Sequence, residues 1–236
     1  MHFSIQCGII YLKLEFQRGV ERKENRIWGF LIFNKQSFNQ KQLRFSDSGE
    51  RTQKMCIEQR IQEITQNQNT IFYFIEPGLS SYKNIMQLYS QRNNDDLLRY
   101  LFYDFYSIQG LSHEKRDKCF KYFLKNAGQS KKGFYNGICG ITKRNELSLA
   151  TKLFHTANPK DGIIIDSHVC NFCGRKGEKH DFQLWSNIQN DFIQNGFNRL
   201  ENFFNNLFPD DRGISPCKKI DFMIWGWGKW KKWRKK

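Results

Sequence analysis

Proline, acidic residues and long apolar runs are scarce in this chain of 236 residues. With only 4 prolines and 17 glycines, the composition excludes a protein that consists mainly of linkers. The longest apolar run near the N-terminus spans residues 7–14 and is interrupted by Lys13. A membrane-spanning helix needs roughly 20 apolar residues. We therefore expect neither a transmembrane segment nor a cleavable signal peptide.

The shortage of acidic residues leaves the chain strongly basic. Lysine and arginine number 38 against 23 aspartate and glutamate residues, which gives a formal net charge of +15. A positive field of this size attracts polyanions. The expected partner is thus a nucleic acid or an anionic membrane surface, although net charge says nothing about the fold.

The chain also lacks an even set of cysteines, since it has seven. Without a secretion signal, an odd number predicts reduced thiols rather than a disulfide framework. We expect an intracellular protein, nuclear in a eukaryote and otherwise in the cytoplasm or nucleoid. Aromatic residues make up 16% of the chain, including 22 phenylalanines, which predicts a folded domain with a core.

The pattern of apolar residues predicts two parts. Residues 1–78 predict a small α+β element, with a β-hairpin from stretches 3–16 and 27–33, a helix over 51–65 and a strand over 71–75. Residues 80–236 predict a helical domain, so the expected fold class is mainly α. Its expected helices span residues 82–89, 95–108, 113–125, 146–157 and 183–208.

Two charged residues stand out in the helical part because their neighbours are apolar. Lys152 lies on the helix expected over 146–157, and Asp166 follows an apolar stretch and is suited to cap a helix that starts at Ser167. Burial makes a lysine a neutral amine nucleophile, and helix N-terminal amides stabilise a carboxylate. The alternative is that Lys152 reaches solvent and Asp166 is only a cap.

These residues carry a resemblance to a known family. Lys152, a helix end at 158–159, the apolar stretch 163–165 and the sequence Asp166-Ser167-His168-Val169 together resemble the catalytic core of the helix-hairpin-helix DNA glycosylase superfamily. More closely, the segment looks like a compact branch with the fold of 8-oxoguanine DNA glycosylase. That branch tends to carry an Asp followed by a Trp near its C-terminus, and Asp221 and Trp225 fit. The resemblance covers about residues 134–225.

The resemblance implies a helix-hairpin-helix glycosylase-like helical domain, with Lys152 as the nucleophile, Asp166 as the catalytic carboxylate and no cofactor. The chain departs from the family in the hairpin, where residues 140–149 lack the usual Leu-Pro-Gly-x-Gly. Lys143 and Arg144 are candidates to replace the backbone grip on a DNA phosphate by side-chain contacts. The iron-sulfur cysteine cluster of endonuclease III is also missing.

Four side chains have a metal-binding interpretation and a structural one. Cys170 and Cys173 form a C-x2-C pair, and His180 and Cys217 are the further ligands that a zinc site would need. No second clean pair is present, so we favour the interpretation in which the two cysteines pack as small apolar residues and no metal is bound.

Other candidates concern the pocket and the phosphate backbone. His155 and His168 are candidates to line the pocket with Trp225, although for His155 we favour a hydrogen-bonded core role. Arg175 and Lys176 lie in a basic loop that is expected to be exposed and able to contact phosphate.

The C-terminal tail alternates tryptophan with basic residues. Its three interpretations are a nucleic-acid contact, a membrane-surface segment and the end of the helical core. We favour core packing for the first two tryptophans, Trp225 and Trp227, and phosphate contact for the basic end, with Lys231 and Lys232.

The sequence thus predicts a DNA glycosylase, with or without AP-lyase activity, that excises a damaged or modified base from a nucleotide flipped out of double-stranded DNA. Two alternatives remain open at this point. One is a non-catalytic module on the same helical fold that binds DNA or RNA, and the other is a basic structural subunit of a ribonucleoprotein. The sequence names neither the base nor the oligomeric state.

Overall fold

The computed structural model of the chain describes residues 5–6, 9–10 and 49–235. It divides the chain into two compact units, Met1–Ser46 and Asp47–Lys236. The described residues of the first unit form two short antiparallel strands, β1 (Ile5–Gln6) and β2 (Ile9–Ile10). The rest of the predicted hairpin, including residues 27–33, lies outside the described residues.

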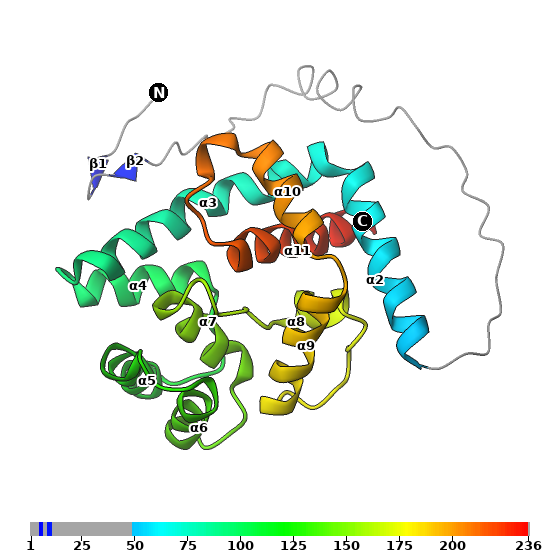
Figure 1. Ribbon diagram of the computed structural model, residues 1–236. Helices are drawn as coiled ribbons and strands as arrows, with labels where there is room; N and C mark the ends of the chain where they lie inside the picture. Colours follow the sequence, from blue (N-terminus) through cyan, green and yellow to red (C-terminus); the bar gives the residue numbers. More distant parts are fainter. Residues whose placement is uncertain (1–4, 7–8, 11–48, 236) are drawn as a thin grey trace. The chain divides into compact units, whose positions relative to one another are not determined.

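In the part of the second unit that the structure describes, all regular structure is helical, which confirms the mainly α class (Figure 1). The predicted segment 183–208 forms two helices, and none of the described helices is long and apolar enough to cross a membrane. The elements are α2 (Gly49–Gln66), α3 (Gln68–Gln91), α4 (Asp95–Phe105), α5 (His113–Asn126), α6 (Lys131–Thr142), α7 (Leu147–Ala157), α8 (Ser167–Phe172), α9 (Phe182–Gln194), α10 (Asn198–Leu207), the 3-10 turn η1 (Pro209–Asp211) and α11 (Pro216–Trp233).

The strand predicted over residues 71–75 is wrong, because these residues lie inside α3. The boundary expected between residues 78 and 80 falls inside the same helix, which also contains Pro77. A proline inside a helix costs about 3 kcal/mol, since it removes one hydrogen bond and its ring clashes with the preceding turn. Burial of a large apolar side chain is worth about 1.5–3 kcal/mol, so a buried stripe outweighs this cost. The stripe consists of Ile71, Ile75, Leu79, Tyr82 and Ile85.

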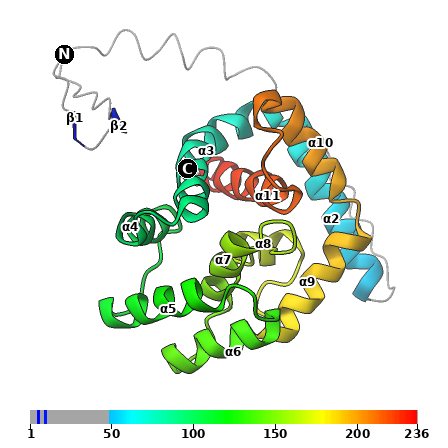
Figure 2. The same ribbon diagram turned by 60° about the vertical axis from the view of Figure 1, so that its left-hand side comes forward.

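Helix α11 lies at the centre of the second unit (Figure 2). It packs against α3, α8 and α10. A Cβ atom on Gly226 would come to 2.8 Å from side-chain atoms of Ile71 and Ile75, closer than real Cβ atoms approach. Glycine at this position therefore allows α11 to lie close to α3, which draws the C-terminal segment into the core.

Helices α5, α6 and α7 pack against one another, and α7 also contacts α3. A turn of residues 143–146 joins α6 to α7, and Lys143 in it adopts a left-handed conformation with a φ of 61°. Helix α7 carries Lys152.

Candidate active site

A cavity of about 470 Å³ brings together residues that are far apart in the sequence. The predicted catalytic residues line it, Lys152 from α7 and Asp166 from the start of α8, together with the pocket candidates His168 and Trp225. The end of α4 closes another side through Tyr106. The volume falls within the range of ligand-binding pockets, which is about 300–1,000 Å³.

Lys152 is buried in this cavity, with an aromatic ring beside its amine. Helix α7 is buried on all sides, so the Lys152 side chain is only 8% exposed. Its Nζ lies 5.4 Å from the centroid of the Tyr106 ring and makes no hydrogen bond or ion pair with the described residues. Burial lowers the pKa of Lys152, with Asp166 and Asp221 acting in the opposite direction. The alternative in which Lys152 reaches solvent is therefore wrong.

Asp166 caps α8, as predicted. Its Oδ1 accepts hydrogen bonds from the backbone amides of His168 at 2.8 Å and Val169 at 3.0 Å. The segment before it is tied to α7, because the amide of Ile165 donates to Oγ1 of Thr151 at 3.0 Å. This bond places Asp166 beside the helix that carries Lys152. The other oxygen of Asp166 makes no hydrogen bond within the described residues, so it is available to a ligand.

A second lysine and a second aspartate line the same cavity. Lys218 and Asp221, on α11, are 2% and 7% exposed, and the Lys218 ammonium donates to the Asp221 carboxylate at 2.7 Å. Burial raises the pKa of Asp221, and the attraction to Lys218 offsets this only in part. Sequence reasoning found Asp221 only through the family resemblance and missed Lys218. The available signal was a pair of opposite charges at positions i and i+3, directly before the uncharged stretch 222–228 of the same helix.

The opening of the cavity carries aromatic and basic side chains. Burial lowers the pKa of His168, with Lys232 and Lys229 acting in the same direction and Asp166 against it. The neutral ring of His168 packs on Gly228, where any Cβ atom would overlap the ring. Trp225 is half-buried, and the Lys229 ammonium lies 5.1 Å from the centroid of its ring. An anionic ligand that enters here therefore meets lysine at the rim.

His155 lies in the core behind the cavity. It is fully buried, its Nδ1 donates to the Gly162 carbonyl at 2.6 Å, and its Nε2 accepts from the Tyr82 hydroxyl at 3.0 Å. It is not among the residues that line the cavity, and its burial and two hydrogen bonds fit the core role. Burial and the nearby Lys218 lower the pKa of His155 to about 3, against the opposing effect of its bond to Gly162.

The buried His155 is expected to make the protein less stable in acid. Unfolded chains bind a proton at histidine near pH 6.5, whereas the folded chain binds one at His155 only near pH 3. The contribution of His155 to the free energy of unfolding is therefore fully present above about pH 6.5. Below this pH it falls by up to about 1.4 kcal/mol per pH unit. Urea unfolding between pH 7 and pH 4 measures this slope. A His155→Gln variant is expected to show a shallower slope, and an unchanged slope contradicts the prediction.

The zinc alternative is not supported. Across the residues that the structure describes, no group of three or more His, Cys, Asp or Glu side chains is arranged to hold a metal ion. Cys170 and Cys173 are buried in the apolar core, as the structural interpretation predicted. Cys217 instead donates its thiol to the carbonyl of Lys160 at 3.3 Å, and His180 lies exposed at the cavity.

Several basic residues predicted to contact phosphate are bound by protein groups. Arg175 binds Asp191 through two hydrogen bonds of 2.6 and 3.1 Å, and Lys231 lies 3.1 Å from Glu63. Arg144 pairs with Glu146 and donates to the carbonyl of Gly110 at 3.0 Å. These protein contacts compete with a phosphate for the three side chains, and their role as phosphate ligands stays a prediction. The other three candidates, Lys143, Lys176 and Lys232, are exposed, and their contact with phosphate stays a prediction.

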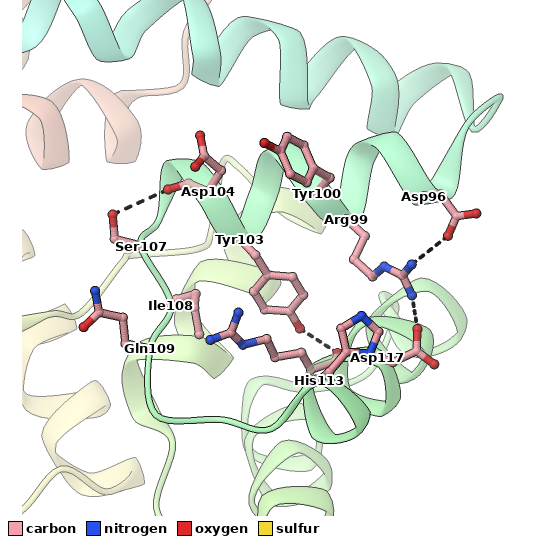
Figure 3. A pocket seen from close by; sticks show the side chains of 11 residues that line it. Asp96, Arg99, Tyr100, Tyr103, Asp104, Ser107, Ile108, Gln109, His113 and Asp117 are labelled. Atoms are coloured by element: carbon pink, nitrogen blue, oxygen red, sulfur yellow. Dashed lines mark hydrogen bonds and ion pairs between the residues drawn. The ribbon is translucent and has the colours of Figure 1, made fainter.

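A larger cavity, of about 520 Å³, lies between α4 and the start of α5 (Figure 3). Its carboxylates outnumber its guanidinium groups: Asp96, Asp104 and Asp117 face Arg99 and Arg116. Arg99 is held by Asp96 at 2.9 Å and by Asp117. None of the predicted site residues lines this cavity, and its acidic lining disfavours a phosphate-bearing ligand. We therefore place the candidate active site in the smaller cavity.

Comparison with known proteins does not identify the chain. No family model matches it, and neither a curated protein nor a solved structure matches it.

Proposed function

We propose that the chain is a DNA glycosylase that excises a damaged or modified base, with Lys152 as its nucleophile. The observation that carries this proposal is that one cavity contains a buried amine and a carboxylate oxygen, neither of which is hydrogen-bonded to a described residue. The cavity is large enough for one nucleotide and is rimmed by lysine. A base in a duplex is shielded by its neighbours, so the target nucleotide would be flipped out to enter.

The chemistry needs a neutral amine and a fixed negative charge. The Lys152 amine attacks C1′ of the sugar, the C1′–N bond breaks, and the base leaves with the bonding electron pair. Asp166 stabilises the positive charge that develops at C1′. The new C–N bond leaves a proton on Nζ, which passes to the departing base. Opening of the sugar ring then gives a Schiff base, from which β-elimination can cleave the strand.

The order of elements also supports the proposal. Helix α6, a short turn, α7 with Lys152 and the cap at Asp166 follow one another as the resemblance to the helix-hairpin-helix DNA glycosylases implies. Asp221 and Trp225, which the resemblance adds near the C-terminus, line the same cavity. The proposal thus combines a sequence resemblance with a cavity that contains every residue it needs.

Borohydride trapping tests the proposal. Purified protein is incubated with a duplex that carries one abasic site, and borohydride reduces any imine between Lys152 and the C1′ aldehyde to a stable amine. We expect a covalent adduct that peptide mass spectrometry maps to Lys152, and none with an intact duplex. A folded protein that binds this DNA without forming an adduct would remove the lyase mechanism.

A non-catalytic nucleic-acid-binding module is the second candidate. It is favoured by the hairpin at residues 140–149, which lacks the Leu-Pro-Gly-x-Gly sequence usual in the family. Such a module predicts salt-sensitive binding without base release, so a glycosylase assay on duplexes with oxidised, deaminated and alkylated bases separates the two functions.

A further inference from the structure

The cavity contains two lysines whose surroundings differ sharply. Lys152 and Lys218 flank the same ring, with their Nζ atoms 5.4 and 5.2 Å from the centroid of Tyr106. Both side chains are buried. Two buried ammonium groups beside the same ring repel each other, so the groups around each lysine determine how well its charge is stabilised.

Lys218 has everything that a buried ammonium requires. Its Nζ donates to Asp221 at 2.7 Å, and four aromatic rings surround it. Contacts between a desolvated cation and ring faces are worth about 2 kcal/mol or more in favourable cases. The rings are Tyr82, Phe105, Tyr106 and Phe222, with centroids 4.4–5.2 Å from the nitrogen.

Lys152 has far fewer contacts that would stabilise a positive charge. One ring lies near its Nζ, and no hydrogen-bond acceptor among the described residues reaches it. The charged and titratable groups that line the cavity with it are Asp166 and His168 from the start of α8, His180 from the loop before α9, Lys218, Asp221 and Lys229 from α11, and Tyr106 from the end of α4. Asp221 is already bound to Lys218, and Oδ1 of Asp166 accepts hydrogen bonds from two amides. Both carboxylates therefore stabilise a positive charge on Lys152 less than free carboxylates would.

We propose that Lys218 is a positioning residue for Lys152: its fixed positive charge, held by Asp221 and four aromatic rings, favours the neutral amine of Lys152. Two positive charges on buried side chains disfavour each other, and an adjacent cation is a recognised way to activate an amine nucleophile. The proposed role rests on the proposed glycosylase function. Lys218 itself forms no bond to the substrate.

Competitive acylation tests this role without DNA. Acetic anhydride reacts with neutral amines only, so peptide mass spectrometry at a series of pH values gives the acylation midpoint of Lys152 in each variant. We expect Lys218→Met to raise this midpoint by about one pH unit, a tenfold loss of neutral amine near neutral pH. Lys218→Arg keeps the charge and is expected to leave the midpoint unchanged. Asp221→Asn is expected to lower it.

The acylation midpoint is expected to rise in Lys218→Met and to fall in Asp221→Asn, and these opposite shifts separate a charge effect from a packing effect. If Lys218 were only structural, Lys218→Met and Asp221→Asn would both open the site to water and move the midpoint toward that of exposed lysines. That result, or an unmoved midpoint in Lys218→Met, would overturn the proposal. Lys218→Gln replaces Lys218→Met if the latter does not fold. Absence of a borohydride adduct in the wild type, with these midpoint shifts intact, would count against the glycosylase function alone.

Discussion

Replacing Lys152 by methionine is expected to abolish the borohydride adduct with abasic DNA. Methionine fills a similar volume but has no amine, so no imine can form at C1′. The variant is expected to be at least as stable as the wild type, because a buried amine without a hydrogen bond to a described residue costs free energy. Denaturing gel electrophoresis measures the adduct, and a thermal melt checks the fold. DNA binding is expected to persist, since the exposed lysines are unchanged.

Lys219→Met is the matched control for this variant. Lys219 is 4% exposed, donates to the carbonyl of Arg212 at 3.1 Å and lies 3.7 Å from Glu201, outside the cavity. Lys219→Met removes an equally buried amine, but this amine has two partners in the protein. We therefore expect it to lose more stability than Lys152→Met and still to form the adduct. An adduct that survives in Lys152→Met would show that another amine is the nucleophile, and Lys218 would be the next to examine.

The centre of the candidate site could be predicted because its signals are local. A lysine within an apolar helix and an aspartate directly before a helix start are visible over about 15 residues of sequence. Lys218 could not be placed in this way. Its position depends on α11 passing through the middle of the unit, which follows from tertiary packing such as the close approach at Gly226.

The difference between local sequence signals and tertiary packing also explains why the strand over residues 71–75 and the exposure of Arg175 were predicted wrongly. Ile71 to Ile85 has helical spacing throughout, but Pro77 outweighed this spacing in the prediction, and only packing against α11 shows that the helix continues. Arg175 looked like a solvated loop residue because its partner Asp191 belongs to another helix. A charge pattern predicts that a cation is present, but only the fold shows whether a carboxylate has already bound it.

Replacing Gly162 by alanine is expected to cause the largest loss of stability among single methyl additions in the site region. A Cβ atom there would lie 2.5 Å from Cα of His155 and 2.9 Å from the carbonyl oxygen of Asn158. Both are backbone atoms at the end of α7, so neither can move aside as a side chain would. Overpacking of this kind costs about 3 kcal/mol or more. Urea unfolding at neutral pH measures the loss.

The Gly162 substitution also links stability to chemistry. The Gly162 carbonyl holds His155, and the segment that follows leads directly to Asp166, so a shifted backbone moves the carboxylate away from Lys152. The folded fraction of Gly162→Ala is therefore expected to give less borohydride adduct than the wild type. Gly140→Ala is the matched control: Gly140 lies in α6 with open space around its Cβ position, so alanine is expected to stabilise by up to about 1 kcal/mol. Equal unfolding midpoints for the two variants would show that the loop at Gly162 yields, and would remove the argument that this loop fixes Asp166.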